Sequence, residues 1–363
     1  MSILGLHHIT LVSSNAQRTI DFYTKVLGLR LVKKTVNFDD PGAYHLYFGN
    51  ETGAPGSAIT YFEWPDAPKG HPGIGGTHHY ALQVPDYDAL LKWKRRLVDH
   101  GLKVDGPFDR HYFKSIYFHD PDGMVIEIAT NGPGWTMDEA PDKIGTEHRD
   151  PPADMIHSNR DNETIKATLW ESPVETITAD MALANGMHHI TAIGADIQRT
   201  NAFYEGLLGL RRVKMTSNFD DPTSAHWYWG VGDGRPGTII TYFERDPRKT
   251  NAVQMGAGQT HHFAFAVENE DVQLEFRERL LKAGISVSPV RDRIYFKSIY
   301  TQDPDGHIVE LATVGPGFMV DEDRAHLGEK LMLPPWLERS RSTIESQLTP
   351  VTLPEWAAPQ SIR

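Results

Sequence analysis

Hydrophobic residues recur along this chain with two spacings, which alternate in a fixed order. Apolar positions three and four residues apart predict four amphipathic helices, each closed by a glycine that suits a C-terminal cap. These helices are expected at residues 17–28, 88–101, 198–209 and 272–284. Short apolar or alternating runs such as AITYFE (58–63) and MVIEIAT (124–130) predict strands around each helix. One strand, one helix and three strands recur in this order, so the pattern predicts an α+β fold of four βαβββ modules.

Internal repeats support this division and indicate a duplication that occurred twice. HHIT, NFDDP, ITYFE, YFKSIY and DPDG each occur in both halves of the chain, in the same order. The modules are expected at 4–64, 74–130, 185–245 and 258–313. Two of them make up the first half, 1–130, and two make up the second, 185–313. Residues 131–184 are rich in Pro, Asp and Glu and predict a crossover linker, and 314–363 predict a packed tail with little regular structure.

Composition and charge exclude several classes of protein. The net charge of −12 argues against a nucleic acid partner. No apolar run approaches the roughly 20 residues of a membrane span, and the first residues lack a signal-peptide pattern, so a cytoplasmic protein is expected. The chain has no cysteine, which excludes disulfides, thiolate metal sites and a cysteine nucleophile. A metal ion would therefore need histidine or carboxylate ligands.

Eight of the 18 histidines stand in adjacent pairs, each at the strand expected to open a module. Successive residues of a strand face opposite sides, so one histidine of each pair is expected to enter a cavity. The second is the better candidate, because His8 would share its face with the small residues Thr10 and Val12. The candidate ligands are His8, His79, His189 and His262. The first histidines would be packed or would support these ligands.

Two glutamates stand alone in the apolar last strands of the second and fourth modules, at Glu127 and Glu310. A buried carboxylate is costly unless it is paired or binds a metal. Two histidines with one glutamate form the facial triad of non-haem Fe(II) oxygenases, which leaves open positions for substrate and O₂. The alternative is that the histidines only fill strand positions and the glutamates pair with arginines.

The DPDG turns fix the register of the strands that carry these glutamates. A type I turn closed by a glycine bulge places a tyrosine directly opposite each glutamate. An arginine precedes each tyrosine by the same interval in both halves. The residues grouped in this way are Arg293, Tyr300 and Glu310 in one half and Arg110, Tyr117 and Glu127 in the other. The alternative is a tyrosine that only packs across the strands and an arginine that only lies on the surface.

Four modules with HHIT…AQRTIDFYTKVLGLR and DPDGHIVELAT resemble the vicinal oxygen chelate superfamily, which includes glyoxalase I, fosfomycin-resistance proteins and ring-cleaving dioxygenases. The resemblance covers about residues 4–313. YHLYF, HHFAFAV and the Arg–Tyr–Glu spacing make the chain most similar to the hydroquinone 1,2-dioxygenases. This resemblance implies two half-open barrels, each built from two modules around a metal. It also implies extradiol-type cleavage of a hydroquinone or catechol by O₂, with Fe(II) as cofactor or Mn(II) in the same ligands.

Spacing alone allows two ways of dividing the ligands, because either neighbouring modules or modules one and four could pair. The resemblance favours the second way, since the family's iron is held by the first and fourth modules. It implies one triad of His8, His262 and Glu310 and another of His79, His189 and Glu127. By the same resemblance the residues around the iron are His7, Thr10, His261, Arg293 and Tyr300. Among these, Tyr300 is expected to move protons and Arg293 to balance negative charge.

Two other functions stay open at this stage. One is a glyoxalase-like isomerase or transferase, although Thr60 and Thr241 replace the extra carboxylate that the resemblance would place there. The other is a metal-free protein that sequesters a ligand, of the bleomycin-resistance type. Any of these could form a homo-oligomer.

Overall fold

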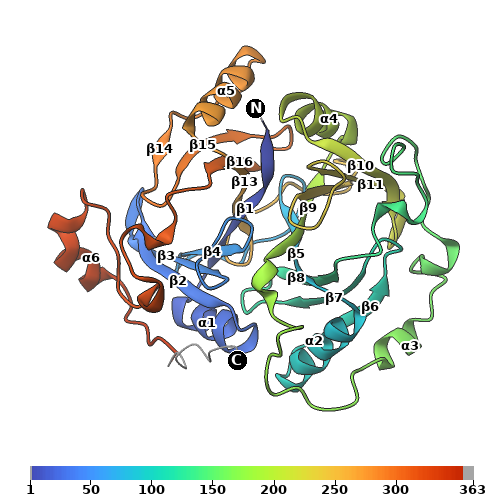
Figure 1. Cartoon of the computed structure of the whole chain (residues 1–363), viewed down its shortest axis with the longest axis horizontal. Coiled ribbons are helices and arrows are strands. Elements are labelled where there is room, and N and C mark those ends of the chain that lie inside the picture. Colours follow the sequence, from blue (N-terminus) through green and yellow to red (C-terminus); the bar gives the residue numbers. More distant parts are fainter. Residues whose placement is uncertain (1, 355–363) are drawn as a thin grey trace.

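The computed structural model describes residues 2–354, which form two strongly curved sheets of eight strands each, with helices around them (Figure 1). The first sheet has the strand order β14 (Arg291–Asp292), β15 (Lys297–Gln302), β16 (Ile308–Thr313), β13 (Thr260–Val267), β1 (Ile3–Ser13), β4 (Ala58–Glu63), β3 (Asp40–Gly49) and β2 (Arg30–Asn37). The second has the order β10 (Arg211–Asn218), β11 (Asp221–Gly230), β12 (Ile239–Glu244), β9 (Met187–Gly194), β5 (Thr77–Val84), β8 (Val125–Thr130), β7 (Lys114–His119) and β6 (Asp105–Asp109). The expected pair of half-open barrels is confirmed.

Each barrel combines modules from both halves of the sequence. β1 of the first module pairs antiparallel with β13 of the fourth, and β5 of the second pairs antiparallel with β9 of the third. Modules one and four therefore share the first sheet, and modules two and three share the second, as the resemblance favours. The chain completes the second barrel before it returns to the first.

The α-helices are α1 (Ala16–Asp21), α2 (Tyr87–Asp99), α3 (Asn162–Ala167), α4 (Ile197–Asn201), α5 (Glu270–Lys282) and α6 (Arg341–Gln347). The helices expected at 17–28 and 198–209 are interrupted, because α1 and α4 each continue as a π-helical turn, Phe22–Val26 and Ala202–Leu207. Such a turn rotates neighbouring side chains, and Phe22 and Tyr23 are both buried although they are adjacent. The predicted glycine caps are confirmed by positive φ angles of 68°, 80°, 74° and 77° at Gly28, Gly101, Gly209 and Gly284. No helix within residues 2–354 is long and apolar enough to cross a lipid bilayer.

The linker and the tail each strap across a barrel and pair with a fully buried lysine. A buried ammonium group is tolerated only when it is paired, so these contacts fix both straps. The pairs are Lys214 of β10 with Asp138 and Glu139 of the linker, and Lys33 of β2 with Asp321 and Glu322 of the tail. The end of the expected tail, residues 355–363, lies outside the described residues.

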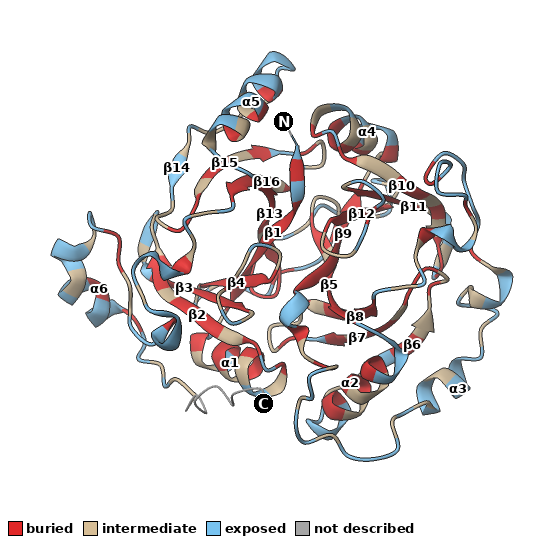
Figure 2. Cartoon of the chain, in the orientation of Figure 1, coloured by how far each residue is buried: buried red, intermediate tan, exposed pale blue. Residues whose placement is uncertain are grey.

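Burial follows the sheets (Figure 2). The central strands are buried along most of their length, whereas the outer faces of α2 and α5 are exposed. Most polar residues of the central strands, including all six candidate ligands, are buried as well. Buried polar groups of this kind need partners, so the site is considered from these residues upward.

Candidate metal centres

The first candidate centre lies on three adjacent strands, with His8 on β1, His262 on β13 and Glu310 on β16. Nε2 of His8 lies 3.2 Å from Nε2 of His262. Oε2 of Glu310 lies 3.3 Å from Nε2 of His8 and 3.0 Å from Nε2 of His262. Three potential ligand atoms therefore converge on one point inside the barrel.

The second centre repeats this arrangement in the other barrel with His79, His189 and Glu127. The two Nε2 atoms are 3.2 Å apart, and Oε2 of Glu127 lies 2.8 Å from Nε2 of His79 and 3.1 Å from Nε2 of His189. The structure thus groups the six predicted ligands into the two sets that modules one with four, and two with three, would form.

The carboxylates of both centres have the electrostatics of a cation site. Burial alone would raise the pKa of Glu310, but the imidazoles of His8 and His262 bring it well below its usual range. The pKa of Glu127 is likewise lowered by His189 and His79 against the effect of burial. Within the described residues, Oε2 of Glu310 and both carboxylate oxygens of Glu127 accept no hydrogen bond. Charged buried oxygens without donors, facing imidazole nitrogens, fit a bound divalent metal ion.

The histidine pairs depart from the alternation expected of a strand. His7, His78, His188 and His261 each stand at a register shift, where the ladder skips one residue. Such a bulge turns two successive side chains toward the same side. In each pair the two Nδ1 atoms therefore lie 2.7–2.9 Å apart. The first histidine does not point to the opposite face but contacts the candidate ligand.

These contacts fix the protons of the first barrel's histidines. If Nε2 of His8 presents a lone pair to a metal, its proton must sit on Nδ1 and be donated to Nδ1 of His7. His7 then carries its own proton on Nε2, which lies 3.2 Å from the carbonyl oxygen of Thr313. Burial and the neighbouring His8 lower the pKa of His7 to about 3, so this ring stays neutral. His7 thus orients the ligand ring as an outer partner of a metal site does.

The tyrosine register predicted from the turns is confirmed, since Tyr300 lies opposite Glu310 and Tyr117 lies opposite Glu127. Arg293 donates from Nε to the Tyr300 hydroxyl at 3.2 Å and pairs through Nη2 with Asp39 at 2.9 Å. Burial and the Glu310 carboxylate raise the pKa of Tyr300, so its phenol keeps its proton at neutral pH. A neutral phenol and a paired guanidinium therefore lie beside the first centre.

The other predicted residues also surround the first centre, in a cavity of about 160 Å³. His261 lines this cavity, and Oγ1 of Thr10 lies 3.0 Å from Nε2 of His262. The structure thus places His7, Thr10, His261, Arg293 and Tyr300 around His8, His262 and Glu310.

Sequence reasoning missed a polar chain that leads away from this centre. Thr10 Oγ1 lies 2.7 Å from Oγ1 of Thr60, which lies 3.0 Å from Nε2 of His45, and Nδ1 of His45 lies 2.9 Å from the Tyr47 hydroxyl. The second barrel has the same chain through Thr191, Thr241, His226 and Tyr228. The sequence feature that could have indicated this chain is the His-x-Tyr spacing that YHLYF and AHWYW share.

Comparison with known proteins agrees with this fold. The Glyoxalase/Bleomycin resistance protein/Dioxygenase superfamily matches residues 5–128 and 186–311. The chain belongs to this superfamily. A crystal structure of a "putative dioxygenase from Bacillus subtilis subsp. subtilis str. 168" superposes with a TM-score of 0.77 at 32% identity and covers 98% of this chain and 99% of that one.

Two relatives with named activities indicate the class of reaction. The chain is 34% identical to the "Putative ring-cleaving dioxygenase MhqO" of Bacillus subtilis (strain 168), over 97% of this chain and 98% of that protein. It is 29% identical to the "Chlorohydroquinone/hydroquinone 1,2-dioxygenase" of Sphingobium indicum, over 92% of each. These relatives support a ring-cleaving dioxygenase as the broad activity of this chain.

Proposed function

We propose that this chain is a metal-dependent dioxygenase that opens the ring of a hydroquinone or a catechol at the centre formed by His8, His262 and Glu310. The observation that carries the proposal is that the Nε2 atoms of His8 and His262 converge on Oε2 of Glu310, an oxygen that accepts no hydrogen bond within the described residues. Tyr300 and Arg293 lie beside this group. Cleavage is extradiol-type, next to a carbon that bears a hydroxyl group. Both atoms of O₂ enter the product, and the ring supplies the electrons that reduce them.

The size and charge of the first cavity support a single uncharged ring as substrate. A cavity of about 150 Å³ can hold one benzene ring, and this one measures about 160 Å³. The rings of Phe62 and Phe296 line it and offer faces and edges to an aromatic substrate. Its charged lining groups outside the triad are Arg293 and Asp39, which neutralise each other. A neutral diol of one ring matches this environment.

The ligand set suits Fe(II), and Mn(II) could occupy the same ligands. A ferrous ion supplies the open coordination positions and the electron transfer that a spin-forbidden reaction between O₂ and an aromatic ring requires. Thr60, at 2.7 Å from Thr10, is bonded within the polar chain and brings no further carboxylate to the centre. The set therefore remains two histidines and one glutamate, which favours an oxygenase over a four-ligand isomerase.

The residues around the centre have distinct roles in this reaction. The Tyr300 hydroxyl, which keeps its proton at neutral pH, donates to a substrate oxygen and takes the proton back as the ring opens. Arg293 stabilises the negative charge that develops on the substrate oxygen atoms, and this interaction is strong because the site is shielded from water. His7 holds the proton arrangement that leaves a lone pair on Nε2 of His8. His261 and the phenylalanines keep water away from the reacting ring.

The test is an oxygen electrode with protein loaded with Fe(II) without O₂ and then given hydroquinone or catechol. We expect substrate-dependent O₂ uptake with loss of the aromatic absorbance. Isomerisation of a hemithioacetal without O₂ uptake would instead establish the glyoxalase-like activity. Protein purified without added metal should retain metal, whereas a metal-free protein that binds the diol unchanged would be a sequestering protein.

Metal counting tests the ligand assignment independently of activity. The double variant His8→Ala with Glu310→Ala should lose the ion of the first centre and keep that of the second. The matched double variant is His79→Ala with Glu127→Ala, which should do the opposite. Loss of both ions from either folded variant would contradict the assignment.

A further inference from the structure

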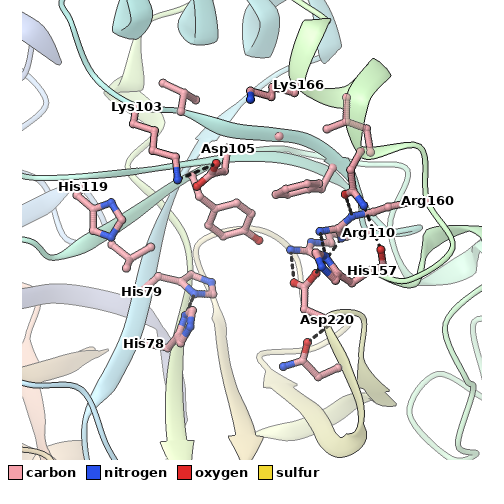
Figure 3. A pocket seen from close by; sticks show the side chains of 18 of the residues that line it. His78, His79, Lys103, Asp105, Arg110, His119, His157, Arg160, Lys166 and Asp220 are labelled. Atoms are coloured by element: carbon pink, nitrogen blue, oxygen red, sulfur yellow. Dashed lines mark hydrogen bonds and ion pairs between the residues drawn. The ribbon is translucent and has the colours of Figure 1, made fainter.

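The outer cavity of the second barrel reaches a residue of its triad, whereas the outer cavity of the first barrel does not. The space that the second triad lines measures only about 20 Å³, but it shares His79, Arg110 and Tyr117 with an outer cavity of about 760 Å³ (Figure 3). In the first barrel the cavity at the centre measures about 160 Å³, and the outer residues line a separate hollow of about 630 Å³. The difference comes from the linker, since residues 157–166 supply a wall of the larger cavity. The two centres are therefore alike in ligands but not in the space beside them.

The charge of the outer cavity of the second barrel also differs from that of the cavity at the first centre. In the first barrel Arg293 forms an ion pair with Asp39, at a distance of 2.9 Å. In the second barrel Asp220 is shared, at 2.9 Å from Nη2 of Arg110 and at 2.8 Å from Nη1 of Arg160. Figure 3 shows both guanidinium groups meeting at Asp220, across the cavity from His79. Two positive charges with one negative charge leave a surplus positive charge next to the centre.

The rest of the lining keeps this surplus, with Lys103 paired with Asp105 at 3.6 Å and Arg245 paired with Asp221 at 3.5 Å. Lys103, Lys166 and Arg245 also line the second cavity, and Arg245 stands where the first half has Trp64. The lining contains five lysines and arginines against three acidic residues outside the triad. The first cavity has one of each outside its triad. A positively charged cavity in a chain of net charge −12 attracts anions and suits an anionic ligand.

Arg110 has hydrogen-bond donors to spare for such an anion. Arg110 is only 8% exposed to solvent. Within the described part of the chain, its Nε and Nη1 atoms have no acceptor in good hydrogen-bond geometry. In the first barrel, by contrast, Nε of Arg293 donates to Tyr300. Buried donors without acceptors are costly, and the oxygen atoms of an anion would satisfy them. The rings of Phe108 and Tyr117 lie against the same guanidinium group, at 5.0 and 5.4 Å.

We propose that the outer cavity beside the second centre binds an aromatic diol that carries an acidic substituent, such as a carboxylate, which the first cavity is too small and too neutral to accept. The acidic group lies against Arg110 and Arg160, and the hydroxyl groups face His79, which lines both this cavity and the space at the triad. This inference rests on the proposed function only in treating the second triad as a metal centre. The two barrels then serve two classes of substrate, one neutral and one anionic.

The experiment compares two probes that differ by one carboxylate, hydroquinone and 2,5-dihydroxybenzoate. Each is titrated by calorimetry into the Fe(II)-loaded full chain in the absence of O₂, so that binding and not turnover is measured. We expect 2,5-dihydroxybenzoate to bind once per chain and more tightly at low salt. Arg160→Gln should weaken this binding by about tenfold, because a buried charge-assisted contact is lost. Lys166→Gln, at an exposed residue, should weaken it by only about threefold.

Unchanged hydroquinone binding shows that these variants are folded. The matched control is Arg293→Gln in the first barrel, which should weaken hydroquinone binding and leave 2,5-dihydroxybenzoate binding unchanged. The inference is overturned if 2,5-dihydroxybenzoate binding is insensitive to Arg160→Gln or is lost in Arg293→Gln. Absence of O₂ uptake with a normal titration would remove the proposed function alone. Ring cleavage of hydroquinone with no binding of 2,5-dihydroxybenzoate would remove this inference alone.

Discussion

At the scale of single residues, Tyr300 offers the sharpest test of the reaction. Its hydroxyl lies 3.2 Å from Nε of Arg293, and its raised pKa keeps the phenol protonated. Tyr300→Phe removes this proton without touching a candidate ligand. Turnover of hydroquinone should fall by about 10²–10⁴-fold, as expected for an acid–base group, while metal content stays the same. Tyr117→Phe is the matched control and should leave hydroquinone turnover unchanged; equal rates in wild type and Tyr300→Phe would reduce Tyr300 to a packing residue.

The sequence predicts the position of Tyr300 but not that of His45. The register of Tyr300 depends on one tight turn, whose glycine and aspartate are local and visible in DPDG. His45 reaches Thr60 only because β3 pairs with β4, and Thr60 reaches Thr10 only because β4 pairs with β1. A contact that depends on several strand pairings has no local signal. Repetition of the same spacing in both halves is the one trace of it in the sequence.

At the scale of elements, the bulges explain why β1, β5, β9 and β13 each carry an adjacent pair of histidines. Strand alternation predicts that adjacent side chains separate, and a bulge reverses this at one residue. The bulge arises where β1 pairs with β13 and where β5 pairs with β9, so it depends on partners far away in the chain. For this reason the sequence identifies the pairs as special and the first histidines as supporting residues, but it does not show that both rings turn to the same side.

The bulged histidine should control metal affinity. His7→Phe keeps a buried ring of similar size but removes the nitrogen that accepts from Nδ1 of His8. Loss of such an outer partner typically weakens metal binding by about 10–100-fold. Competition with a chelator should therefore extract the ion of the first centre more easily, with the second unchanged. His188→Phe is the matched variant and should weaken the second centre only; if both centres keep wild-type affinity, the bulged histidines are packing residues.

At the scale of the whole molecule, the sequence predicts the modules but not how they combine. Each ligand strand is the same whether neighbouring modules or modules one and four pair, so periodicity cannot decide. The structure decides it through long-range contacts, including the straps on Lys33 and Lys214. The linker is visible in the composition of residues 131–184, yet its role as a wall of the second cavity depends on where Arg160 meets Asp220.

Two buried polar clusters join the barrels, and they differ at two residues, since Tyr80 and Met124 of one correspond to Phe263 and His307 of the other. In one, Tyr61 of β4 donates to Asp120 of the second barrel at 2.9 Å and contacts further tyrosines. In its twin, Tyr242 of β12 donates to Asp303 of the first barrel, which also faces His307 at 3.1 Å. His307 has no counterpart in the first cluster, where the equivalent residue is Met124. One buried carboxylate thus faces an imidazole, and the other accepts from a phenol and two backbone N–H groups.

This difference predicts opposite effects of pH on the two clusters. Burial raises the pKa of Asp120 from 3.8 to about 6, whereas His307 keeps the pKa of Asp303 below its usual value against the effect of burial. A carboxyl group whose pKa is raised by folding stabilises the fold fully at low pH. That contribution is lost as pH rises from about 4 to about 6, and for Asp120 it corresponds to about 3 kcal/mol. For Asp303 the sign is reversed, and stability is lost as pH falls.

Asp120→Asn should therefore stabilise the chain at neutral pH. The amide oxygen can still accept from the backbone N–H groups of Asp122 and Met124, and its NH₂ group can donate to the Tyr61 hydroxyl. The free energy of unfolding, measured with denaturant at pH 4 and pH 7.5, should change in favour of the variant by a few kcal/mol between the two values, up to about 3 kcal/mol. Asp303→Asn, which removes the partner of His307, should destabilise the chain at pH 7.5. A variant Asp120→Asn whose stability follows that of the wild type at both pH values would show that Asp120 is ionised at no cost to the fold.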